Sequence, residues 1–335
     1  MQMAIDIAVS LVPVLVFLIA LVFLDSFKLV KTRALLMTIA WGIGAALICY
    51  AINERVLQHV ISDDFYYKRY GSPVLEECFK SLIVVYLITS KRVGFMVDAA
   101  IYGFAIGTGF ALAENIYYVQ AIRDANIFLW IIRGFGTAIM HGGTTAILGI
   151  IAKSLSDQYA SATIKAFVPG LLLAIVIHSF FNHFFLPPVV STLLLIILLP
   201  LLMMYVFKRS EQKTREWLGV NLDADMELLR LINTGNFSDS KIGQYLFSLK
   251  SRFPSEVIID MLCLLRIHTE LSIKSKGVLM MREVGFQSPE DPEVKEKFDE
   301  MKYLEKSIGK TGKLAILPFL HTSSQSLWQI YMLEK

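Results

Sequence analysis

Residues 94–119 decide the fold of this chain: they read GFMVDAAIYGFAIGTGFALAENIYYV and are apolar over almost their whole length. An α-helix of about 20 such residues crosses the hydrocarbon core of a bilayer. Gly103 and Gly107 lie four residues apart on one helix face, where small residues let two membrane helices pack closely. Asp98 and Glu114 are the only charged residues in the stretch. It therefore predicts a closely packed membrane span with a carboxylate near its end.

Six other stretches have a comparable length and composition: residues 5–24, 34–52, 74–90, 127–151, 166–186 and 189–207. The stretch 74–90 is the weakest of them, because it is short and carries Glu76, Glu77 and Lys80. We therefore predict an all-α fold, a polytopic membrane helix bundle of about seven spans.

The charged residues divide the chain into two domains. Residues 1–207 contain 13 Lys or Arg and 11 Asp or Glu, whereas the shorter stretch 208–335 contains 19 and 18. We predict a transmembrane domain over 1–207 and a soluble helical domain over 208–335. In the second domain Pro254 precedes an amphipathic stretch over about 255–283, and Asp291-Pro292-Glu293 is typical of a helix start.

Lys and Arg residues near the span ends predict the orientation of the bundle. One side has 11 of them and the other has 4. Cytoplasmic loops are enriched in Lys and Arg, so we expect the N-terminus outside and the C-terminal domain in the cytoplasm. The net charge of +3 is too small and too dispersed to indicate a nucleic-acid partner.

Ionisable residues inside the predicted spans are the candidate functional residues, because each costs roughly 2.5–3.5 kcal/mol to insert into a bilayer. They are Glu76, Glu77, Lys80, Asp98, Glu114, Arg133, His141 and His178, with Asn182 as a polar neighbour. Lys80 lies four residues after Glu76 and three after Glu77, so it can pair with either carboxylate. His178 and Asn182 are four apart and share a helix face.

The predicted depths of these residues agree. With the N-terminus outside, Glu76, Glu77, Glu114, His178 and Asn182 all lie in the outer half of their spans, and His141 lies near the middle. Four separate spans thus bring acids, imidazoles and an amide to one depth, which favours a shared site over scattered structural residues. Asp98, at the opposite end, is better explained as a helix-start residue.

Three classes of function fit such a site. Buried Glu and His side chains relay protons or bind cations in ion-coupled transporters and channels, although the sequence has no inverted repeat of the kind many transporters contain. A non-catalytic membrane scaffold that displays the C-terminal domain is a third reading. Catalysis by the carboxylates and imidazoles is the remaining class, and the motifs described next favour it.

Three short motifs in this region resemble those of one family. Glu76-Glu77-Cys78-Phe79-Lys80 resembles the EExxK motif of PrsW-type intramembrane proteases, Phe110-Ala-Leu-Ala-Glu114-Asn115 their FxxxE motif, and His178-Ser-Phe-Phe-Asn182 their HxxxN-type motif. The resemblance covers about residues 70–190. The family belongs to a wider superfamily of CAAX-prenyl and bacteriocin-processing proteases, whose CAAX-type members carry a histidine where Glu114 stands.

The resemblance implies an intramembrane endopeptidase that makes a site-1-type cut in a membrane-anchored protein, such as an anti-sigma factor. The cut would fall near the outer face of a bacterial inner membrane. Two adjacent carboxylates in a low-dielectric site cannot both ionise cheaply, so Glu76 or Glu77 is a candidate general base, with Lys80 holding the other as an anion. His178 and Asn182 are candidates to bind the oxyanion, and Glu114 to orient an imidazole or the water.

A metal-dependent alternative uses some of the same residues. In that scheme Glu114, His141 and His178 bind one Zn²⁺, and Glu76 or Glu77 supplies a further ligand or the base. Three ligands from three helices need no local motif, so the lack of an HExxH sequence does not exclude zinc. The sequence leaves the metal-dependent and metal-free schemes open.

Overall fold

The computed structural model describes residues 2–53, 64–122, 125–159, 164–234, 236–286 and 291–320, together with residues 330 and 333. These residues form helices and connecting turns, with no strand among them. They divide into two compact units, Met1–Ser210 and Glu211–Lys335. The predicted all-α membrane bundle is confirmed.

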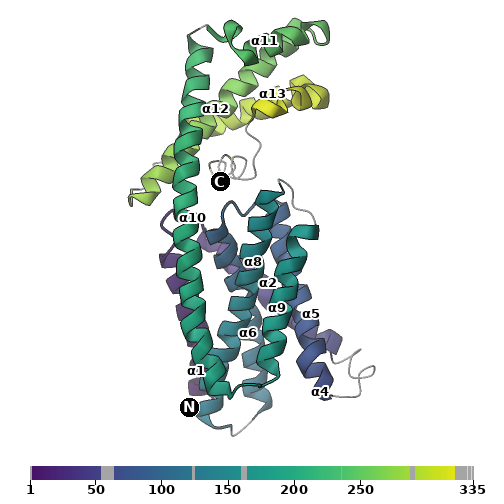
Figure 1. Cartoon of the computed structure of the whole chain (residues 1–335), viewed down its shortest axis with the longest axis vertical. Coiled ribbons are helices and arrows are strands. Elements are labelled where there is room, and N and C mark those ends of the chain that lie inside the picture. The colour runs from purple at the N-terminus through teal and green to yellow at the C-terminus, as the bar shows by residue number, and fades with distance from the viewer. Residues whose placement is uncertain are drawn as a thin grey trace. The chain divides into compact units, whose positions relative to one another are not determined.

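The membrane unit contains the long helices of the first 210 residues (Figure 1). They are α1 (Gln2–Phe23), α2 (Thr32–Ile52), α5 (Ser72–Thr89), α6 (Met96–Ala121), α8 (Ile139–Gln158), α9 (Ile164–Asn182) and the first half of α10 (Pro188–Asn233). Shorter pieces are α4 (Asp64–Tyr66), α7 (Ile127–Ile132) and two π-helical turns, η2 (Tyr67–Gly71) and η3 (Arg133–Ala138).

Six helical stretches of the described chain are long and apolar enough to cross a membrane, and they match six of the seven predicted spans. The stretch Ile127–Gln158 is one of them and joins α7, η3 and α8. The exception is α5, which corresponds to the predicted span 74–90. Its three charged residues lower its hydropathy, although it packs against α2, α6, α8 and α9 as a member of the bundle.

Helix α6 is the core of the membrane unit. It packs against α1, α2, α5 and α8. In its most apolar 18-residue segment 83% of the residues are buried, whereas the corresponding share for α1 is 22%. The predicted close packing at Gly103 and Gly107 is confirmed: a Cβ atom at Gly107 would lie 2.1 Å from the carbonyl oxygen of His141. The absence of a side chain at Gly107 therefore lets α8 carry His141 directly against α6.

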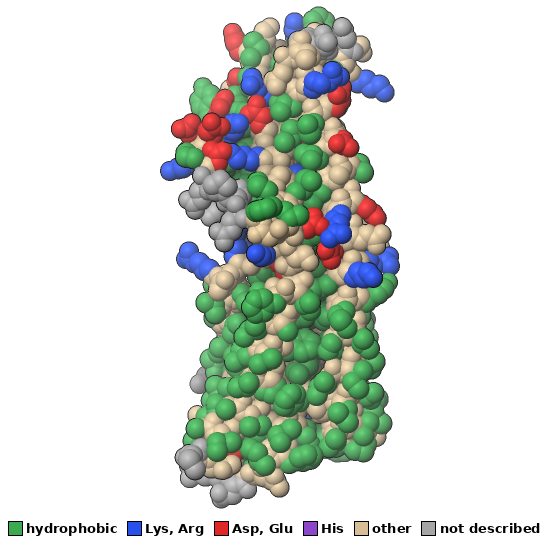
Figure 2. Space-filling view, turned by 90° about the vertical axis from the view of Figure 1, so that its left-hand side faces the viewer, with side chains coloured by type: hydrophobic (Ala, Val, Ile, Leu, Met, Phe, Trp, Pro, Cys, Tyr) green, Lys and Arg blue, Asp and Glu red, His purple; other side chains and the backbone are tan. Residues whose placement is uncertain are grey.

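Side chains on the outside of the membrane unit are mostly apolar. Figure 2 shows hydrophobic side chains over most of the face in view of this unit, whereas Lys, Arg, Asp and Glu gather on the C-terminal unit. The continuous helix α10 leaves the membrane unit at about Ser210 and continues to Asn233. The predicted domain boundary at 207 thus falls inside a helix rather than in a linker.

The C-terminal unit is helical and has its own hydrophobic core. It contains the end of α10, η4 (Asn236–Asp239), α11 (Lys241–Ser248), η5 (Leu249–Ser251), α12 (Ser255–Glu283), α13 (Pro292–Ile316) and η6 (Leu317–Phe319). The two helix starts predicted at Pro254 and Asp291 are confirmed, and the Asp291 carboxylate accepts the Glu293 N–H at 3.0 Å.

A buried ion pair connects two helices of the C-terminal unit: Lys276 on α12 donates to Asp225 on α10 at 2.5 Å. Burial lowers the pKa of Lys276, although Asp225 opposes this shift.

Candidate metal centre

Four helices of the membrane unit bring the predicted site residues together. Glu76, Glu77 and Lys80 come from α5, Glu114 from the second half of α6, His141 from the start of α8 and His178 from the end of α9. Hydrogen bonds or ion pairs connect all six side chains. Residues more than 100 positions apart in the sequence thus share one buried site.

Carboxylates fix the protonation of both imidazoles. His178 Nδ1 lies 2.8 Å from Glu77 Oε1, and His141 Nε2 lies 3.0 Å from Glu114 Oε2. An ionised carboxylate only accepts hydrogen bonds, so each of these ring nitrogens carries the proton. A neutral imidazole then keeps a lone pair on its other nitrogen, which is Nε2 in His178 and Nδ1 in His141.

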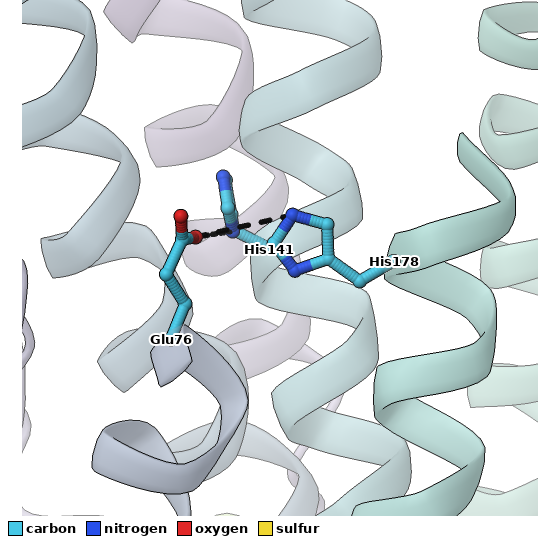
Figure 3. A group of neighbouring side chains, drawn as sticks. All are labelled: Glu76, His141 and His178. Carbon is cyan, nitrogen blue, oxygen red and sulfur yellow. Dashed lines mark ion pairs between the residues drawn. The ribbon is translucent and has the colours of Figure 1, made fainter. Parts of the chain in front are cut away.

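These two lone pairs and one carboxylate oxygen face the same space (Figure 3). Glu76 Oε2 lies 4.0 Å from His141 Nδ1 and 3.9 Å from His178 Nε2, and one ligand atom from each of the three residues lies within 4.8 Å of the others. Glu76 Oε2 is buried and has no hydrogen-bond partner among the described residues. Two histidines and one glutamate are a donor set of catalytic zinc sites, so these three residues fit a metal ion.

The structure groups a different carboxylate with the two histidines than the sequence led us to expect. The expected set was Glu114, His141 and His178, but Glu114 contacts His141 Nε2, whereas Glu76 is the carboxylate near His141 Nδ1. Glu76 takes its place in the cluster. Glu114 and Glu77 instead hold the protonated nitrogens of the two imidazoles, as the carboxylates behind metal-binding histidines commonly do.

Lys80 pairs with Glu77 rather than with Glu76. Its Nζ donates to Glu77 Oε1 at 2.5 Å and lies 3.2 Å from His141 Nδ1, and both Lys80 and Glu77 are fully buried. Thr144 Oγ donates to the same Glu77 oxygen at 3.2 Å. Glu77 is thus held as an anion by three donors, whereas the Glu76 side chain is partly exposed and receives a hydrogen bond from Ser72.

Arg133 is a further member of the site, for which the sequence predicted no specific role. Its Nη2 lies 3.3 Å from Glu114 Oε2, its Nε donates to Asn115 Oδ1 at 2.9 Å, and its guanidinium lies 4.0 Å from the Tyr118 ring centroid. The π-helical turn η3 carries Arg133, and such turns are frequent at functional sites. The sequence signal was an arginine in an apolar span, eight residues before His141.

Asn182 is the one predicted site residue that lies outside this cluster. Its Nδ2 donates to the carbonyl oxygen of Lys68 at 3.1 Å. One helical turn beyond His178, the end of α9 meets η2, and the Asn182 amide binds that backbone instead of the site.

A cavity of about 640 Å³ gives access to the cluster. Glu76 and Glu114 line it, together with residues from the second half of α2 and of α6. A membrane-embedded helix bundle with a buried two-histidine, one-glutamate centre beside an open cavity belongs to the class of membrane enzymes rather than of passive scaffolds.

Residues 31–207 match the model of the PrsW family of intramembrane metalloproteases. The match covers more than half of the chain, so the chain belongs to this family and is an integral membrane protein of the intramembrane protease class. No curated protein and no solved structure matched the chain. The resemblance to PrsW proteases is thus confirmed, and the family description favours a protease over a transporter. The wider CAAX-protease placement stays a prediction.

Proposed function

We propose that this protein is a zinc-dependent intramembrane endopeptidase in which Glu76, His141 and His178 hold the metal ion. The observation that carries the proposal is the convergence, within 4.8 Å, of one nitrogen from each imidazole and a Glu76 oxygen that has no hydrogen-bond partner among the described residues. A zinc ion bound there would polarise the scissile carbonyl and lower the pKa of a bound water toward neutrality. Hydrolysis of an amide bond needs both a polarised carbonyl group and an activated water molecule.

The other residues of the site have supporting roles in this proposal. Glu77 and Glu114 hold the imidazole protons, which leaves the lone pairs on His178 Nε2 and His141 Nδ1. Lys80 Nζ is hydrogen-bonded to His141 Nδ1 at 3.2 Å, so it would have to give up this contact when the metal ion binds. Arg133 keeps Glu114 ionised, and Lys80 does the same for Glu77. The acceptor of the water proton is Glu76 or Glu114, because these two carboxylates line the cavity.

We propose as substrate a membrane-anchored protein, of the anti-sigma-factor kind that the family resemblance implies, cut near the outer face of a bacterial inner membrane. The sequence-based orientation supports this side. Glu76, Glu114 and His178 lie toward the ends of α5, α6 and α9 that this orientation places in the outer half of the membrane, and His141 lies near the middle of its span.

Purified protein in detergent or liposomes, incubated with a single-span substrate protein, tests the activity. A protease produces two fragments, whereas a transporter or scaffold leaves the substrate intact. The metal is tested separately: we expect about one zinc per chain by elemental analysis, lost together with cleavage in His178→Ala. Full cleavage after exhaustive chelation would rule out the metal and leave a glutamate-activated water.

A further inference from the structure

The cavity beside the cluster has two chemically different parts. Glu76 and Glu114 form a polar wall, while its most buried lining residues are Ala46, Cys49 and Phe110, which are 8%, 5% and 3% exposed. Ala46 and Cys49 come from α2 and Phe110 from α6. Together with Ala113, they form an apolar part of the lining, which we call the floor.

Phe110 joins this floor to the cluster. The centroid of its ring lies 5.1 Å from that of the His141 ring and 4.8 Å from Lys80 Nζ. A peptide bond presented to Glu76, His141 and His178 therefore lies close to the floor. Side chains of an extended peptide alternate between opposite faces, so one residue flanking that bond points toward Phe110.

Small side chains on two facing helices keep the floor open. Ala46 on α2 and Ala113 on α6 both line the cavity, and both belong to the apolar cluster around Phe110 and Cys49. Larger residues at either position would fill the space above Phe110. The floor residues themselves carry no charge, and the Lys80 ammonium, 4.8 Å from the centroid of the Phe110 ring, is already paired with Glu77.

We propose that the floor formed by Ala46, Cys49, Phe110 and Ala113 is a specificity pocket that binds one large apolar side chain next to the bond that is cut. The inference rests on the proposed protease function and adds a substrate class to it: segments with Phe, Leu or a similar residue at one position flanking the cut. An apolar pocket typically changes kcat/KM by about 10- to 200-fold between substrates that differ by one methylene group in the side chain it binds.

Single-span reporter proteins test the pocket. The cut bond is first located by mass spectrometry, and each flanking residue is then varied among Phe, Leu, Ala and Asp. With the wild-type protein we expect Phe or Leu to be cut at least about tenfold faster than Ala or Asp at one flanking position, and a much weaker preference at the other.

Two variants fill the pocket from opposite sides, Ala46→Leu and Ala113→Leu. Each should slow the Phe reporter about tenfold or more and change the Ala reporter less than about threefold. Ala51→Leu is the matched control, since Ala51 lies on the same helix as Ala46 but is exposed on its surface. Zinc content and thermal unfolding show whether each variant is folded, and one folded pocket variant is enough for the comparison.

The outcomes separate this inference from the proposed function. If the wild-type protein cuts the reporters at equal rates whatever the flanking residues, or if the folded pocket variants keep the wild-type preference, the specificity pocket is wrong and the protease stands. If folded, zinc-loaded wild-type protein cuts no reporter, the protease function fails and the pocket with it.

Discussion

At the scale of single residues, three neighbouring carboxylates have three different environments. Glu77 receives hydrogen bonds from Lys80, His178 and Thr144, and Glu114 is paired with Arg133 and His141. Glu76 receives one hydrogen bond, from Ser72, and its Oε2 has no hydrogen-bond partner among the described residues, which is also true of Glu77 Oε2. What distinguishes Glu76 Oε2 is its place 4.0 and 3.9 Å from one nitrogen of each imidazole, which indicates a ligand role.

Glu76→Gln and Glu114→Gln should therefore differ in metal binding. We expect Glu76→Gln to lose zinc and cleavage together, by about a hundredfold or more, because it removes a ligand charge. Glu114→Gln should weaken zinc about 10- to 100-fold, as expected for a residue that acts through His141. Zinc titrations followed by elemental analysis, with cleavage measured at saturating zinc, check this. Equal zinc affinity in the two variants, or unchanged cleavage by both and by the double variant, would contradict the assignment.

Glu77→Gln should destabilise the bundle more than Glu76→Gln does. The change leaves the Lys80 ammonium fully buried without its counter-ion, and removing one partner of a buried pair costs about 3–5 kcal/mol. Thermal unfolding in detergent measures the difference. Adding Lys80→Met to Glu77→Gln removes the unpaired charge and should recover most of the loss. If Glu77→Gln and Glu76→Gln unfold at the same temperature, the ion pair contributes little.

At the scale of elements, contacts between α6 and α8 determine where His141 lies. The backbones of these helices approach at Gly103 and Gly107, and a Cβ at Gly103 would lie 2.5 Å from the Thr145 carbonyl oxygen. Thr145 in turn donates its hydroxyl to the His141 carbonyl at 3.0 Å. The position of the imidazole is thus coupled to the spacing of two helices.

Gly107→Ala should lower both stability and zinc affinity. The new methyl group would lie 2.1 Å from the His141 carbonyl oxygen, so the helices must separate, and such overpacking typically costs about 1–3 kcal/mol. Gly44→Ala is the matched control, because a Cβ there has no atom within 4 Å and alanine favours a helix. Thermal unfolding and zinc titration of both variants check the prediction, which fails if they behave alike.

The contact between α12 and α13 should weaken in acid. Burial alone would raise the pKa of Glu270, but hydrogen bonds from Lys297 and Arg266 outweigh it and lower this pKa. A carboxylate with a lowered pKa in the folded state stabilises above its unfolded pKa of about 4.3, and this stabilisation is lost as the pH falls further. Hydrogen exchange of α12 and α13 in the full chain, corrected for the intrinsic pH dependence, should show the loss. Glu270→Gln should reduce it.

At the scale of the whole molecule, one continuous helix belongs to both units. Helix α10 contributes Leu199, Met203 and Phe207 to the core of the membrane unit and Leu228 to the core of the C-terminal unit. A helix without a break between an apolar half and a charged half leaves the membrane without a loop. The two domains predicted from charge are thus connected by regular structure rather than by a linker.

Reporter fusions test the predicted orientation of the whole chain. A reporter after Lys335 should be cytoplasmic, and one inserted near Asp63 should be external, because the Lys and Arg residues gather on the first side. Both positions lie outside the described residues, and the insertion site follows α2. A cytoplasmic signal at Asp63 would place the cluster near the inner face and contradict a cut at the outer face.

The sequence by itself determined the helices and the chemistry that they carry. Apolar stretches of about 20 residues with few charges can satisfy their backbone in a bilayer only as helices, so the spans were readable one by one. Because the bilayer core is apolar, the polar residues Glu76, Glu77, His141 and His178 stand out in these spans. Three spaced motifs then indicated the family.

Only the tertiary structure decided which of these residues meet. Helical periodicity places Glu77 and Lys80 on one face of α5 but does not say that His178, 101 residues later, binds the same carboxylate. Nor does it show that Glu114 lies behind His141, that Arg133 pairs with Glu114, or that Asn182 turns away from the cluster. These relations depend on how four helices rotate and approach one another, which is determined by long-range packing such as that at Gly107 and not by the residues of any one span.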